Sequence, residues 1–205
     1  MRYKQTFGFV LVFWGVFLLG AIFARPYVNR IFFDPSTRAS TITADQTRIE
    51  RAKTADDLPE IKIASKEFGV LIPKINVNAP IKANVDGQTP KRYFKELKTA
   101  VGHLKGSALP DDSGNMVLFG HSSDIPGATS QYPEVFLFLD KLDKGDLITI
   151  FYQNNVYNYA VTTRKTVAAD DLSVVADDSQ NQLTLITCWP PGTNVYRMVV
   201  KAQKK

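Results

Sequence analysis

Cysteine and histidine are scarce in this sequence of 205 residues. Cys188 is the only cysteine, and His103 and His121 are the only histidines. One cysteine allows no disulfide within the chain and no Cys-x-x-Cys redox or zinc motif. No metal site built from cysteine and histidine is therefore expected, and none of the motifs described below implies a cofactor. A lone thiol is most often a small buried hydrophobe, so its surroundings must decide between that interpretation and a reactive role.

Dense blocks of one charge sign are also missing. The 25 lysines and arginines are scattered among 20 aspartates and glutamates, which gives a net charge of +5. No basic cluster stands beside stacking aromatic residues, so nucleic-acid binding is not expected. Weak attraction to an anionic membrane or wall polymer fits the charge better. With 44% hydrophobic and 22% charged residues, the composition is that of a globular protein.

One long hydrophobic run is present near the N-terminus. Phe7 to Ala24 is a stretch of 18 residues without a charge, and a short basic segment precedes it. As a helix this run would be about 27 Å long, close to the thickness of a bilayer core. The run is longer than a usual signal-peptide core and lacks a good cleavage pattern. We therefore predict an uncleaved transmembrane signal anchor over residues 1–24, with a cleaved signal peptide as the alternative.

The chain becomes polar between residues 25 and 66. Thr43 to Ala55 has the charge spacing of a helix, and Asp56-Asp57-Leu58-Pro59 ends it. We predict that residues 25–66 form a polar stalk or linker. A helix packed on the following domain is the alternative. Residues 67–205 are long enough for one folded domain.

Residues 67–205 contain short apolar and β-branched runs separated by turn signals. The expected strands are Phe68–Ile75, Val77–Ile81, Thr99–His103, Asn115–Phe119, Asp146–Gln153, Asn155–Val167, Leu183–Thr187 and Val195–Lys201. Short helices are expected over Pro90–Leu97 and Glu134–Leu142. The Asn154-Asn155 pair predicts a hairpin turn. Eight short strands with little helix predict a mostly β fold, a closed eight-stranded barrel.

Three side chains in these strands, or directly after them, have useful chemistry. Cys188 ends one run, His121 follows another after Gly120, and Arg197 lies in a run that begins shortly after the cysteine. Each has an unremarkable interpretation when taken alone. Together, a thiolate can attack a carbonyl, an imidazole can move protons, and a guanidinium can stabilise an oxyanion. The three therefore predict covalent acyl transfer.

These residues carry a family resemblance. The segment Thr184-Leu185-Ile186-Thr187-Cys188, with an arginine downstream, resembles the TLxTC signature of sortases. Gly114 to His121 is similar to the strand that leads to the catalytic histidine of that family, and Ile72 to Ile81 is similar to its first strand pair. The resemblance runs from about residue 68 to 200. It implies a sortase-like barrel preceded by an N-terminal transmembrane helix, with residues 67–205 as the catalytic domain.

The resemblance also implies roles for single residues. Cys188 matches the nucleophile, His121 the acid/base and Arg197 the arginine that stabilises the oxyanion or positions the substrate. Substrate contacts are expected from Thr187, Trp189 and Ser122.

Several alternatives to these assignments remain open. His103 is the alternative base, and Asp124 is a candidate third member of a triad. The alternative cations are Lys74, Arg92 and Arg164.

The implied protein is a membrane-anchored cysteine transpeptidase of class D/E-like type. It would cleave an LPxTG-like sorting signal between Thr and Gly through a thioacyl-enzyme. The surface protein or pilin would then pass to an amine acceptor such as a cell-wall precursor. The domain would lie outside the cell on a single-pass anchor in the cell membrane. The alternatives are a cysteine hydrolase on the same scaffold and a non-catalytic envelope adaptor in which Cys188 is a core residue.

Overall fold

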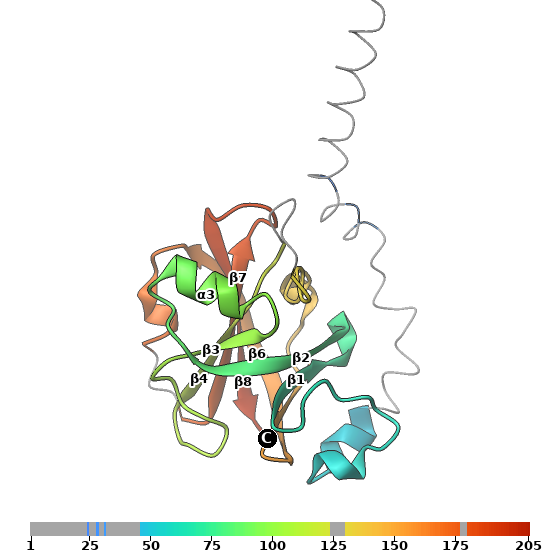
Figure 1. The fold of residues 1–205 in the computed structure, drawn as a ribbon. Helices are drawn as coiled ribbons and strands as arrows, with labels where there is room; N and C mark the ends of the chain where they lie inside the picture. The colour runs from blue at the N-terminus through green and yellow to red at the C-terminus, as the bar shows by residue number, and fades with distance from the viewer. Residues whose placement is uncertain (1–23, 25–27, 29–30, 32–45, 124–129, 177–179) are drawn as a thin grey trace, which may run out of the picture.

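Eight strands close into a barrel in the order β1-β2-β3-β4-β7-β8-β6-β5 (Figure 1). The computed structural model describes Ala24, Val28, Ile31 and residues 46–123, 130–176 and 180–205. The strands are β1 (Phe68–Ile72), β2 (Val77–Val85), β3 (Val101–Leu104), β4 (Asn115–Phe119), β5 (Leu147–Tyr152), β6 (Asn155–Ala168), β7 (Gln182–Trp189) and β8 (Tyr196–Lys204). The predicted mostly β, closed eight-stranded barrel is confirmed.

Two parallel strand pairs, β2–β3 and β4–β7, stand among antiparallel ladders. The crossover from β2 to β3 carries the helix α3 (Pro90–Glu96), where a helix was expected. The β4–β7 pair matters most for function. It aligns Phe119 with Ile186, so the strand that leads to His121 runs beside the strand that ends near Cys188.

Turn chemistry explains two strand boundaries. The strand expected over Phe68–Ile75 stops at Ile72, because Pro73 begins the 3₁₀ turn η3 (Pro73–Ile75) and has no N–H to continue the ladder. The β5–β6 hairpin turns through Gln153 and Asn154, which both have positive φ, at 48° and 67°. Positive φ at both central residues is the type I′ geometry that suits a two-residue hairpin.

The barrel interior is filled from alternating strand positions. Its buried members include Val70, Ile72, Val101, Leu118, Ile148, Ile150, Leu183, Leu185 and Val200. The prediction of a helix over Glu134–Leu142 is wrong, because this segment is a series of turns ending in the 3₁₀ helix η4 (Leu139–Lys141). Phe136, Leu139 and Leu142 are all fully buried, and their spacing of three suits tighter turns than an α-helix has.

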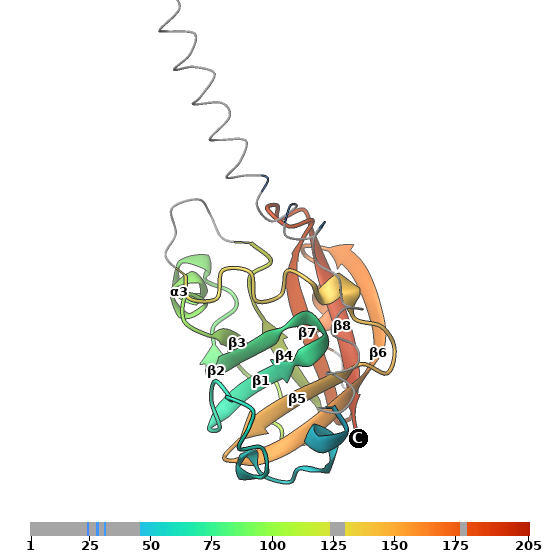
Figure 2. The same cartoon turned by 90° about the vertical axis from the view of Figure 1, so that its right-hand side faces the viewer.

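Residues 46–66, which the sequence assigns to the stalk, lie against the barrel beside β1 and β5 (Figure 2). Residues 46–51 are helical, and the 3₁₀ helix η2 (Ala55–Asp57) follows. Ile49 and Leu58 are each 1% exposed and share a cluster with Leu71 and Phe151. This part of the range therefore follows the packed alternative, because its apolar side chains cover that side of the barrel.

The signal anchor predicted over residues 1–24 lies outside the described residues except for Ala24. Among the residues that the structure describes, no helix has both the length and the apolar character needed to span a bilayer.

Candidate active site

Cys188 and Arg197 lie directly opposite each other in the antiparallel β7–β8 ladder. Side chains at such positions have Cβ atoms about 5 Å apart. Both residues are partly exposed, and Cys188 is a free thiol. The Nη1 atom of Arg197 donates hydrogen bonds to the carbonyls of Asn194, at 3.1 Å, and Tyr196, at 2.9 Å. These bonds tie the guanidinium to the β7–β8 connection, beside the thiol strand.

The backbone around His121 is fixed by hydrogen bonds from both neighbouring segments. Gly120 N donates to the carbonyl of Ile186 at 3.2 Å, which extends the β4–β7 pairing by one residue. The Thr187 hydroxyl donates to the Gly120 carbonyl at 2.8 Å, and Phe136 N donates to the His121 carbonyl at 2.9 Å. His121 therefore leaves β4 at the level at which β7 reaches Cys188.

Gly120 is required by close packing. A Cβ at this position would lie 2.7 Å from Cγ1 of Val135 and 3.0 Å from the ring of Phe136. Both neighbours belong to the turn segment that follows the His121 loop. Any side chain at residue 120 would push that segment, and with it the histidine backbone, away from β7.

Threonine hydrogen bonds hold β7 against β4 at both ends of this strand pair. At the first end, the buried Thr184 hydroxyl donates to Asn115 Oδ1 at 2.8 Å. Gly114, just before Asn115, has φ +126°, a conformation that L side chains rarely adopt. At the other end Thr187 bonds to Gly120. The Gly-Asn pair and Thr184 thus hold the far end of the β4–β7 pair, and the Thr187 bond holds the end beside His121 and Cys188.

The loop after His121 touches the loop after Cys188. Gly192 N donates to Ser123 Oγ at 2.8 Å. Trp189 is half-buried and packs on the barrel core. Ser122 and Thr187 are 2% and 3% exposed. The contacts of Thr187, Trp189 and Ser122 with a substrate stay predictions.

Helix α3 contributes an aromatic pair that the sequence interpretation missed. The Phe94 ring lies parallel to the His121 ring, with 5.8 Å between the centroids and 5° between the planes. Burial raises the pKa of the Tyr93 hydroxyl, a negative charge on Cys188 raises it further, and Arg197 lowers it. Tyr93 thus lies within electrostatic range of both reactive groups. Adjacent aromatics on a short helix were the available signal, because neighbouring helix positions point about 100° apart and cannot share one core face.

His103 has a structural environment instead of a catalytic one. It is 1% exposed and lies inside β3, opposite Leu118 of β4. Its Nδ1 accepts from Asn84 N at 3.2 Å, which assigns the ring proton to Nε2, 3.0 Å from the Ala108 carbonyl. Burial lowers the pKa of this imidazole, and the contacts with Ala108 and Ser107 oppose that shift only in part. A neutral, enclosed ring that is hydrogen-bonded within the β3 region is a poor acid/base.

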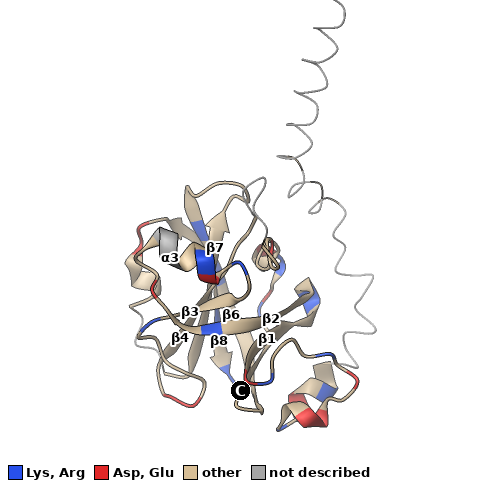
Figure 3. Ribbon diagram, in the orientation of Figure 1, with Lys and Arg blue, Asp and Glu red and all other residues tan. Residues whose placement is uncertain are grey.

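The alternative cations are engaged elsewhere. Lys74 Nζ lies 2.9 Å from Asp143 and 2.6 Å from Asp146. Arg164 donates to the Leu142 carbonyl at 2.7 Å. Figure 3 shows that basic and acidic positions are interspersed along the ribbon. The Arg92 side chain and Asp124 lie outside what the structure describes.

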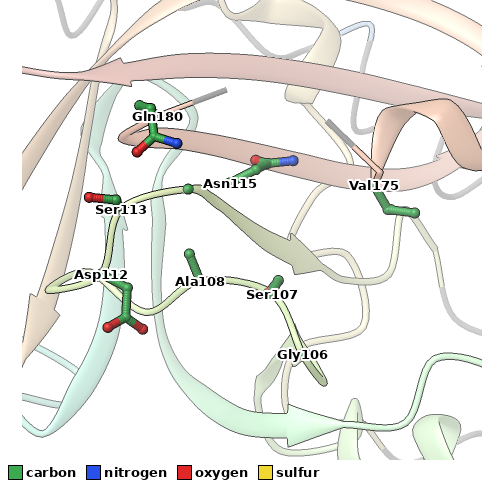
Figure 4. A pocket seen from close by; sticks show the side chains of 9 residues that line it. Gly106, Ser107, Ala108, Asp112, Ser113, Asn115, Val175 and Gln180 are labelled. Carbon is green, nitrogen blue, oxygen red and sulfur yellow. The ribbon is translucent and has the colours of Figure 1, made fainter. Parts of the chain in front are cut away.

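A polar cavity of about 560 Å³ opens at the opposite end of β4 and β7 (Figure 4). Its lining includes Ser107, Asp112 and Gln180, together with Asn115 at the start of β4. Because His121 follows the other end of β4 and Cys188 lies near the other end of β7, this cavity is separate from the thiol site. Among the described residues, no group of three or more His, Cys, Asp and Glu side chains could hold a metal ion.

A cysteine whose cross-strand partner is an arginine, with a histidine at the end of the neighbouring strand of a closed barrel, is an arrangement suited to acyl transfer. Residues 70–205 match the family model described as Sortase domain. The chain belongs to the sortase family, whose members are cysteine transpeptidases.

The chain is similar to several sortases. It is 32% identical to sortase D of Bacillus subtilis over 60% of this chain and 54% of that protein. It is 37% identical to sortase A of Bacillus anthracis, over 70% of this chain and 64% of that one. The match thus spans only about half the length of the Bacillus subtilis relative.

Solved sortase structures resemble the barrel. Pilus-related sortase C of Group B Streptococcus has a TM-score of 0.55 and 29% identity, covering 76% of this chain and 75% of that one. Sortase E1 of Streptomyces coelicolor, solved with a tripeptide in the active site, has a TM-score of 0.55 and 27% identity, over 70% and 91% of the two chains. Relatives of types D and E are compatible with the class that the sequence suggests.

Proposed function

We propose that this protein is a membrane-anchored transpeptidase that cleaves a C-terminal sorting signal and joins the released carbonyl to an amine. The observation that carries the proposal is the placement of Cys188 opposite Arg197, with His121 on the adjoining strand end. The expected substrates are surface proteins or pilins with an LPxTG-like signal. The expected acceptor is an amine of the cell envelope.

The first half of the proposed reaction forms a thioacyl-enzyme. The Cys188 thiolate attacks the carbonyl carbon of the signal threonine, and the carbonyl electrons move onto oxygen. Arg197 stabilises that oxyanion from the neighbouring strand. When the tetrahedral intermediate collapses, the Thr–Gly bond breaks, and His121 gives a proton to the leaving glycine amine.

The second half releases the product. An incoming amine attacks the thioester carbon, and His121 accepts a proton from that amine. The C–S bond then breaks, and Cys188 leaves as a thiolate, ready for another cycle. Atoms and charge balance without a cofactor, since the thiolate and the protonated imidazole return to their starting forms.

The scaffold supports this chemistry by fixing geometry. The Thr187–Gly120 and Ser123–Gly192 hydrogen bonds join the histidine loop to the cysteine strand and its connection. When the reacting groups are held in place, a bimolecular step becomes effectively unimolecular, and this accelerates acyl transfer. The uncharged run Phe7–Ala24 would hold this domain at the outer face of the cell membrane.

The test uses the full chain in detergent with an LPxTG-containing peptide and triglycine as the amine. Mass spectrometry should detect the peptide joined to triglycine and, without the amine, an adduct on Cys188. Cys188→Ala should abolish both species while the far-ultraviolet circular dichroism is kept. Cleavage without any amide product would favour the hydrolase alternative. If the Cys188 thiol of the native protein did not react with an alkylating reagent, the non-catalytic adaptor would be favoured.

A further inference from the structure

Helix α3 brings an aromatic ring to the histidine from outside the catalytic strands. The Phe94 and His121 rings stack in parallel, with centroids 5.8 Å apart. Tyr93 contacts the Phe94 ring at 4.7 Å and meets Phe119 edge-on at 5.9 Å. Phe119 directly precedes Gly120 and His121, so these aromatic contacts fix the helix to both the backbone and the side chain of the histidine segment.

Packing of the barrel core does not account for Phe94. Its side chain is 43% exposed, whereas Leu97 at the end of the same helix is 4% exposed and anchors α3 on the barrel. A partly exposed phenylalanine gains little from burial, but parallel stacking on another ring is a favourable geometry in its own right.

The end of α3 is tied to the segment that follows the histidine loop. Gln131 N donates to the Lys98 carbonyl at 2.7 Å. Phe136, further along this segment, donates its N–H to His121. Backbone hydrogen bonds therefore link the end of the helix to the segment that contacts the histidine backbone. Together with the ring contact, they position Phe94 relative to the imidazole.

We propose that Phe94 is a positioning residue for His121. The stack restricts rotation of the imidazole, so the ring nitrogen stays directed toward the thiol and the leaving amine. The negative face of the phenyl ring also favours the protonated imidazole over the neutral one. This inference rests on the proposed function, because that function gives His121 the proton-transfer role.

The size of the effect follows from the contact. Aromatic pairs and exposed cation–π contacts correspond to changes of about 2- to 10-fold in an equilibrium or rate. Loss of the ring should therefore lower kcat by this factor and leave KM nearly unchanged, since the ring acts on the histidine and not on the peptide. It should also make the imidazole release its proton at lower pH.

The experiment compares the full chain in detergent with its Phe94→Leu variant. Steady-state kinetics with the sorting peptide and triglycine should show kcat lowered about 2- to 10-fold. The His121 ring signals in proton NMR should titrate with a midpoint about half a pH unit lower. The chain has only two histidines, and the signals of His103 are identified from a His103→Gln variant. The NMR readout needs no turnover, so it separates failure of this inference from failure of the proposed function.

Two further variants serve as controls. Phe94→Trp keeps a stacking face and should retain at least half of the activity. Lys95→Ala changes an exposed neighbour on the same helix and should leave both readouts unchanged. The proposal is overturned if Phe94→Leu keeps the wild-type titration midpoint of His121. It is also overturned if Phe94→Leu raises KM alone, because Phe94 would then be a peptide contact.

Discussion

Cys188 and Arg197 form one cross-strand pair of the β7–β8 ladder, so the backbone places their two side chains on the same face of the sheet. The connection between these strands is held by Thr193, whose N–H and hydroxyl both donate to the Pro190 carbonyl, at 3.0 and 2.8 Å. Neither reactive residue therefore depends on a long unanchored loop for its position.

Arg197 should act as a hydrogen-bonding group rather than as a simple charge. Loss of an oxyanion donor typically lowers turnover about 10²–10³-fold, so we expect that range for Arg197→Ala. Arg197→Lys should recover little, because an ammonium lacks the planar fork. The measurement is kcat/KM on one sorting peptide. Near-full activity of Arg197→Lys would show that Arg197 supplies only charge.

The two histidines should differ sharply in their effect on activity. His121→Ala removes the proposed acid/base and should lower kcat/KM about 10²–10⁴-fold. His103→Ala should stay within about tenfold, below the range for general acid–base groups. Both variants need circular dichroism to establish folding. Equal damage from the two substitutions would contradict the assignment of the acid/base to His121.

Thr187 should support activity through the histidine backbone. Thr187→Val removes the hydrogen bond to Gly120 at nearly constant volume, so we expect kcat to fall about tenfold or more through displacement of His121. Thr184→Val is the matched control, because it removes a similar bond, to Asn115, at the other end of β4. It should lower the melting temperature but spare kcat. Equal kcat losses would count against a specific role for Thr187.

The segment before the barrel should contribute to stability. Leu58 is 1% exposed in the cluster with Leu71 and Phe151, so Leu58→Ala should lower the free energy of unfolding by about 2–4 kcal/mol. Urea unfolding measures this change. A chain that starts at Glu67 should be destabilised at least as much, because it leaves those barrel residues uncovered. Wild-type stability of that shorter chain would show that residues 46–66 are dispensable.

Stability should fall in mild acid because of His103. Its pKa is lowered in the folded state, so below about pH 6.5 the unfolded chain binds more protons at this residue than the folded chain does. Its contribution is therefore complete above pH 6.5 and declines as the pH falls toward the folded pKa. Thermal unfolding between pH 7.5 and 5 should show this slope, and His103→Gln should make it shallower. An unchanged slope in the variant would exclude His103 as the cause.

Much of the fold could be predicted because strand signals were local. The β-branched run ending in Cys188 and the apolar run before His121 each became a strand within a residue or two of its expected bounds. Which strands pair could not be derived from these runs. The β4–β7 pair joins segments about 67 positions apart, and only the family resemblance suggested that histidine and cysteine meet.

The errors came from tertiary contacts. Residues 134–142 form an apolar run of helical length, but their backbone bonds close over three residues, as from Leu139 N to the Phe136 carbonyl, and bury Phe136, Leu139 and Leu142 against the barrel. Residues 46–58 look polar as a whole, yet three buried residues, Ile49, Ala55 and Leu58, decide where the segment lies. The sequence did not single out Phe94, because its contact is with the His121 ring, which only folding brings next to it.

The bond between Thr187 and Gly120 spans a large separation along the chain. Forming it closes a loop of 67 residues along the chain, and non-local contacts of this kind carry a loop-closure cost that local contacts avoid. Until β7 joins β4, the nascent polypeptide carries a thiol without its partner imidazole.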